Sequence, residues 1–120
     1  MKKHIDPRHK RRQVVVKQLF AHSFTKQKAT DAAVRTILKK QPTIDKLIES
    51  AAPLWPINQI NRIDLSILRL AVYELLSKKE PVKVIIDEAV ELAKEFGSEA
   101  SPAFVNGVLG KIVEEKEMEK

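Results

Sequence analysis

The sequence predicts an all-α fold, a compact bundle of about six helices. Apolar residues recur at the three- and four-residue spacing of helices along most of the chain. All three glycines lie in the last quarter, and no Asn-Gly or Asp-Gly pair separates alternating apolar runs, so hairpins are not expected. The six prolines fall where helices would begin or end. With 120 residues and 43% hydrophobic content, the chain is long enough for one domain with one core.

Three helices are predicted in the N-terminal half. Asp6 before a proline is typical of an N-cap, so a first helix should run over residues 7–25. Thr30 should cap a second helix that ends near Pro42, and a third helical stretch should follow to position 53. The predicted buried residues of the first helix are Val15, Val16, Leu19, Phe20 and Phe24.

Three stronger helices are predicted in the C-terminal half. After a single turn at 57–60, Asp64 should start a helix that continues to position 75. Proline and glycine should then bound a helix over 81–97, and the last helix should run over 101–112. Gly107 lies inside that helix, where glycine costs roughly 1 kcal/mol, so we expect another helix to cross closely there.

We expect one domain over residues 1–120, with a basic half (1–54), a second half (55–113) and a solvated tail (114–120). Residues 1–40 carry 12 Lys or Arg and 2 acids, a balance of +10, whereas 41–120 carry 10 and 14, a balance of −4. A strongly basic end suits a polyanion, because phosphate contacts release counterions. The alternative is a solvated end that only aids solubility.

Several classes of function are disfavoured. The chain has no cysteine, which excludes disulfides and thiol chemistry and fits a reducing compartment. No apolar run reaches the ~20 residues that cross a bilayer, and the first residues are charged where a signal peptide would be apolar. We therefore expect a cytoplasmic protein without a membrane contact.

The sequence also predicts that the protein is not an enzyme and has no metal or cofactor. His4, His9 and His22 lack any ligand spacing, and no glycine-rich loop could hold phosphates. Glu88 and its acidic neighbours read as an ordinary solvated helix face, since no His or Lys is predicted to converge on them.

The first helix carries the clearest candidate site. Arg8, Arg12, Val16 and Phe20 are four residues apart, so one face is apolar for two turns and then becomes cationic. We expect this basic tip to overhang the core and to bind phosphates, with an imidazole available for base stacking. A frayed basic helix end is the alternative. The further cationic side chains of the tip are His9, Lys10 and Arg11.

Two other features involve side chains of the predicted C-terminal helices. Arg69 and Tyr73 are placed to form a hydrogen-bonded pair that tethers neighbouring helices. Phe104 lies near the start of the last helix and could be either a packing residue or an exposed stacking platform.

The segments RRQVVVKQLF, IDKLI, RIDLSILRLAVYELL, PVKVIIDEAVELAKEFG and FVNGVLGKI, in this order, resemble the NusB family of bacterial transcription antitermination factors. The resemblance is specific from about Trp55 to Ile112. It implies a bundle of two packed halves that binds single-stranded boxA RNA, chiefly ribosomal, as a heterodimer with the ribosomal protein NusE. It also implies that this assembly joins the RNA polymerase elongation complex and suppresses termination.

The resemblance also implies site residues. The arginine-rich first helix of the family falls on Arg8, His9, Lys10 and Arg12, and its RNA-facing aromatic falls on Phe104. Lys83 matches a basic position near RNA. Asp64 matches an acid that faces NusE, and Val82 belongs to the same partner-facing region.

The chain departs from the family at several positions. The stretch between the first helix and IDKLI is short, so one helix is expected to be missing or reduced to the connector KQKAT. An acidic position before FVNG is Ala100, which should favour RNA binding. Other readings stay open: a protein-interaction adaptor, a homodimer that hides its RNA face, or an RNA-binding subunit of an RNA-modifying enzyme.

Overall fold

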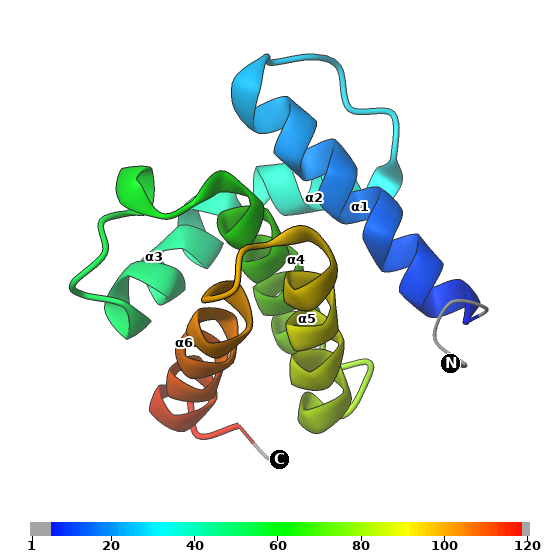
Figure 1. The fold of residues 1–120 in the computed structure, drawn as a ribbon. Helices are drawn as coiled ribbons and strands as arrows, with labels where there is room; N and C mark the ends of the chain where they lie inside the picture. The colour runs from blue at the N-terminus through cyan, green and yellow to red at the C-terminus, as the bar shows by residue number, and fades with distance from the viewer. Residues whose placement is uncertain (1–5, 119–120) are drawn as a thin grey trace.

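The structure is a computed structural model that describes residues 6–118. Over these residues it contains six α-helices, one short 3-10 helix and no strand (Figure 1). The elements in chain order are α1 (Pro7–Phe24), α2 (Ala32–Lys39), α3 (Gln41–Ala51), η2 (Ile57–Gln59), α4 (Arg62–Ser77), α5 (Val82–Phe96) and α6 (Ser101–Glu115). The predicted all-α fold is confirmed.

Side chains just before the helices fix where several of them begin. The carboxylate of Asp6 accepts a hydrogen bond from the backbone N–H of Arg8 at 2.9 Å, as predicted for the start of α1. The cap of α2 is Asp31 rather than Thr30, because the Asp31 carboxylate accepts from two backbone N–H groups of the first turn, at 2.8 and 3.2 Å. Helix α4 begins at Arg62, two residues before the predicted start, because Asn61 caps it.

Helix α4 lies at the centre of the bundle. It packs with α5 and α6 as one antiparallel unit, while α1, α2 and α3 cover its remaining sides, and α3 also contacts α6 (Figure 1). Ile67, Leu68 and Val72 of α4 are fully buried. Each such side chain contributes roughly 1.5–3 kcal/mol when it leaves water, so the core of α4 joins the two halves of the bundle.

The short segment between α1 and α2 contains no helix, as predicted for the connector KQKAT. Phe24, which was predicted to be buried, is 59% exposed because it lies in the last turn of α1, beyond the core. None of the helices in the described range has both the length and the apolar composition needed to span a lipid bilayer.

Gly97 closes α5 as its C-cap, as predicted, whereas Gly107 does not behave as predicted. A Cβ at Gly107 would meet no atom within 4 Å, so no helix crosses closely there. Gly97 instead needs its small size, since a Cβ would lie 2.5 Å from the Cβ of Ser101 and 2.9 Å from the carbonyl oxygen of Ala93. The turn between α5 and α6 therefore depends on this glycine. Helix α6 continues to Glu115, past the predicted end.

Candidate nucleic-acid interface

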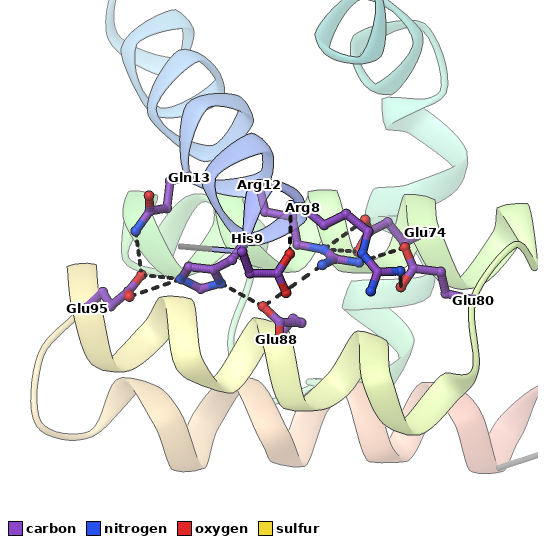
Figure 2. Close-up of polar contacts among 9 residues, drawn as sticks. Arg8, His9, Arg12, Gln13, Glu74, Glu80, Glu88 and Glu95 are labelled. Atoms are coloured by element: carbon purple, nitrogen blue, oxygen red, sulfur yellow. Dashed lines mark hydrogen bonds and ion pairs between the residues drawn. The ribbon is translucent and has the colours of Figure 1, made fainter. Parts of the chain in front are cut away.

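The first two turns of α1 are docked on the bundle and do not overhang it. His9 is 1% exposed and Arg12 is 5% exposed, and both point toward α4 and α5 (Figure 2). Their spacing to Val16 and Leu19 is three, four and three residues, so they continue the buried stripe of the helix. The prediction that His9 and Arg12 project beyond the core is therefore wrong.

His9 is held between two carboxylates of α5. Its Nδ1 lies 2.6 Å from Glu88 Oε1, and its Nε2 lies 3.0 Å from both carboxylate oxygens of Glu95 (Figure 2). Burial lowers the pKa of His9 and is the largest single influence, but the hydrogen bonds and charges of Glu88 and Glu95 together raise it by more, so the pKa lies above 6.5. The imidazolium form can donate to both acids at once.

Arg12 forms a second cluster beside His9. Its Nε donates to both oxygens of Glu74 at 3.1 and 3.0 Å, and its Nη2 donates to Glu80 at 3.1 Å. Glu88 lies 3.9 Å from its Nη1 and links the two clusters. Burial raises the pKa of Glu74, and the nearby Arg12 opposes this rise. We call the six side chains of both clusters the α1 clamp: His9, Arg12, Glu74, Glu80, Glu88 and Glu95.

The clamp corrects the prediction for the acidic face of α5. Glu88 was expected on a solvated face with no basic residue near it, yet His9 and Arg12 both reach it. Because these contacts join residues about 80 positions apart in the chain, local spacing could not reveal them. The carboxylates of the clamp neutralise His9 and Arg12, and these two side chains cannot reach a phosphate in this conformation.

The remaining cations at the start of α1 point away from the clamp. The Arg8 side chain is 72% exposed and only approaches Glu80, at 4.0 Å. Lys10 is exposed and makes no ion pair with a described residue. Arg11 is 51% exposed and donates to Asp31 at 2.6 and 2.9 Å, which lowers the pKa of Asp31 to about 2. Arg8 and Lys10 are thus the cations at this end that can meet a polyanion at little cost.

A hollow of about 240 Å³ lies at the start of α4 and α6. Phe104 is half-buried in its wall, and its ring meets that of Trp55 edge-on, with centroids 6.3 Å apart. Asp64 is 6% exposed, and its Oδ1 has no hydrogen-bond partner. Burial raises the pKa of Asp64, opposed by the hydroxyl of Ser101. An acceptor in this state would gain from a donor supplied by a binding partner.

Val82 and Lys83 lie at the other end of the bundle. They open α5, next to the end of α4, whereas Asp64 opens α4 and Phe104 lies near the end of α5 (Figure 1). The 15 residues of α5 separate these two ends by ~20 Å. Asp64 and Val82 therefore do not meet in one pocket. Lys83 is 79% exposed and lies 3.2 Å from Asp87.

Arg69 is structural, as predicted, but its partner differs. It does not pair with Tyr73; its Nε and Nη2 donate to the two carboxylate oxygens of Asp45 in α3, at 2.9 and 2.8 Å. This bidentate contact ties α4 to α3.

These observations define a small helical protein whose charged clamp fixes one cationic helix end and whose surface offers an apolar hollow beside an acid with one unpaired oxygen. The profile of the NusB family matches residues 15–114, and the chain belongs to this family. It is 38% identical over 130 residues to the transcription antitermination protein NusB of Thermotoga sp. (strain RQ2), covering 91% of this chain and 92% of that protein.

Other relatives match a shorter stretch. The NusB proteins of Chloroflexus aggregans and Roseiflexus castenholzii are 56% and 55% identical over 73 residues, which is 58% of this chain. The aligned part of the chain spans about half the length of these two relatives, 49% and 51%.

Solved structures share the fold. A structure of T. maritima NusB superposes with a TM-score of 0.83 at 36% identity and covers 92% of both chains. A chain in the structure described as "Crystal Structure of a Plectonemic RNA Supercoil" gives a TM-score of 0.82 at 24% identity, covering 94% of this chain and 98% of that one, which shows the fold alone.

Proposed function

We propose that this protein is a transcription antitermination factor that binds single-stranded, boxA-type RNA together with NusE and acts on the RNA polymerase elongation complex. The name shared by its relatives supports antitermination. The main support for RNA binding is the arrangement of side chains on α1, where buried His9 and Arg12 fix the helix end and Arg8 and Lys10 are exposed. A rigid helix end that presents cations to phosphates loses little entropy on binding.

In this proposal the RNA-binding residues have two kinds of role. Arg8, Lys10 and Arg11 contact phosphates, while His9 and Arg12 act as positioning residues behind them. Lys83 adds a phosphate contact at the start of α5, and the half-buried ring of Phe104 is the proposed stacking surface for an unpaired base. The chemistry on α1 needs no catalytic group, so the protein acts by binding.

The hollow at Asp64 is the proposed contact for NusE. Trp55, which is 51% exposed, lines the hollow, and its chain neighbour Leu54 is 87% exposed, so apolar surface is available at this site. A partner that covers this surface and donates a hydrogen bond to Asp64 would satisfy an acceptor that is unpaired in the free chain. Val82, ~20 Å away along α5, would touch NusE only if the partner extends along the bundle.

The test is a fluorescence anisotropy titration of a labelled boxA-like RNA and of a scrambled RNA, each with the protein alone and with NusE. The proposal predicts tighter binding of the boxA-like RNA and a further gain when NusE is present. Equal, weak binding of both RNAs in both conditions would contradict it. Association with NusE without any RNA-dependent change would favour a pure protein-interaction adaptor.

A further inference from the structure

Most cations of the N-terminal half that have no acidic partner lie beyond the clamp, with Lys10 at the start of α1 as an exception. Lys26, Lys28, Lys39 and Lys40 are all exposed, and none of them forms an ion pair with a described residue. At the start of α1, in contrast, His9 and Arg12 are paired with the four glutamates of the clamp, and Arg11 is paired with Asp31. Most of the uncompensated positive charge of this half therefore lies toward the far end of α1 and beyond it.

A groove of about 410 Å³ opens at this far end, between α1, the junction of α2 and α3, η2 and the start of α4. Its lining includes four basic side chains and no Asp or Glu. The basic residues are His22, Lys26, Arg62 and Arg69. Arg69 is neutralised by Asp45, which does not line the groove, so Lys26 and Arg62 set its charge. Such a groove attracts anions.

The groove also holds a planar stack. The guanidinium of Arg62 lies over the ring of Phe24, 4.4 Å from its centroid, and Arg62 Nη1 donates to the carbonyl oxygen of Ser23 at 2.9 Å. The Phe20 ring supports Phe24 edge-on at 4.9 Å. Although held in place on these sides, Phe24 stays 59% exposed. Aromatic rings and guanidinium planes are the surfaces on which unpaired bases stack.

We infer that this groove is a second contact site for single-stranded RNA, with phosphates on Lys26 and His22 and a base on the Phe24–Arg62 stack. The amides of Gln41 and Asn58, which also line the groove, can read base edges. An acidic polypeptide fits less well, because Phe24 is 59% exposed beside these cations and a carboxylate gains nothing from an aromatic ring, whereas an unpaired base stacks on it.

This inference rests on the proposed RNA ligand and extends it along α1. Lys10 and Phe24 are fourteen residues apart on one helix, which is roughly 21 Å. That distance corresponds to about six nucleotides at ~3.4 Å per stacked nucleotide. One strand can therefore contact the start of α1 and the groove if it extends beyond the first site.

The test compares a boxA-like RNA of 12 nucleotides with the same RNA extended by ten uridines at either end. One extension should tighten wild-type binding by about tenfold, the lower part of the range for one base stack. Phe24→Ala and Lys26→Glu should each remove this gain and leave the affinity for the short RNA within about twofold. Lys116→Glu, exposed at the end of α6, changes the net charge equally and should keep the gain.

Failure of this inference differs from failure of the proposed function. If neither extension helps the wild type, or if both variants keep the gain, the groove is not an RNA site. If the short RNA does not bind at all, the proposed function fails; a 20-nucleotide oligouridylate then tests the groove alone and must lose affinity in Phe24→Ala. Loss of NusE binding in both variants with the RNA gain intact would assign the groove to a polypeptide and overturn the inference.

Discussion

The α1 clamp should make a large contribution to stability through Arg12. Replacing Arg12 by Leu leaves Glu74, Glu80 and Glu88 facing one another around a small gap. Removing one partner of a buried ion pair costs about 3–5 kcal/mol. Since these three carboxylates are 22%, 26% and 15% exposed and can recruit water, we expect a loss of about 2–3 kcal/mol in the free energy of unfolding.

Two further variants sharpen this prediction. Arg12→Lys keeps the charge but cannot bridge two carboxylates with a rigid fork, so about 1–2 kcal/mol should be lost. Arg8→Ala is the matched control, because Arg8 is 72% exposed and reaches Glu80 only at 4.0 Å, so its loss should stay below about 0.5 kcal/mol.

The assay is urea unfolding followed by helical circular dichroism, with linear extrapolation to water. Without Arg12 the pKa of buried Glu74 should rise further, since burial raises it and Arg12 opposes that rise. An acid with a raised pKa in the folded state costs stability as pH rises through that pKa. The Arg12→Leu deficit should therefore grow above pH 4.5. Arg12 does not stabilise the bundle in this way if the Arg12→Leu variant stays within about 0.5 kcal/mol of wild type at pH 7, or if Arg8→Ala loses as much.

Three further predictions concern single residues. Because the pKa of His9 is raised above 6.5, the stabilisation of the folded state by its charge is complete below pH 6.5 and is lost as pH rises through the folded-state pKa. In urea titrations the wild type should therefore lose stability from pH 6 to 9, and His9→Gln should lack most of this dependence on pH. Gly97→Ala should destabilise by about 1–3 kcal/mol because its Cβ meets Ser101, whereas Gly107→Ala, with no atom within 4 Å, should stabilise by about 0.5–1 kcal/mol, both read from thermal melts. Asp64→Asn should stabilise the free chain by about 0.5–1 kcal/mol, since it removes a buried charge, while weakening NusE binding in calorimetry; unchanged NusE affinity would exclude Asp64 from that interface.

The helices could be predicted because their signals are local. Asp6, the prolines and the apolar spacing of α4 each act within one or two turns, so the sequence indicated element type and order correctly. The exact first residue of a helix was harder to predict. Thr30 and Asp31 are both good caps, and only the structure shows that the Asp31 carboxylate accepts the backbone N–H groups while also pairing with Arg11.

The charged cluster on α1 could be predicted only in part. The sequence locates the cations, but whether they face water or the core depends on the phase of the helix. Grouping Arg8, Arg12 and Phe20 as one series shifted both ends of the predicted helix face by one residue. The residues that are buried are His9, Arg12, Val16 and Leu19. The acids that neutralise His9 and Arg12 come from α4 and α5, and no local pattern indicates such distant pairs.

In the proposed function, the outward cations of α1 bind RNA while the inward ones hold the helix. The most direct test is the salt dependence of boxA-like RNA affinity for the Arg8→Ala/Lys10→Ala double variant, with Lys111→Ala/Lys116→Ala as the charge-matched control. Loss of two phosphate contacts should lower the slope of log affinity against log salt by ~1.4 in the first variant and leave it unchanged in the control. A slope equal to that of wild type in the first variant would contradict the claim.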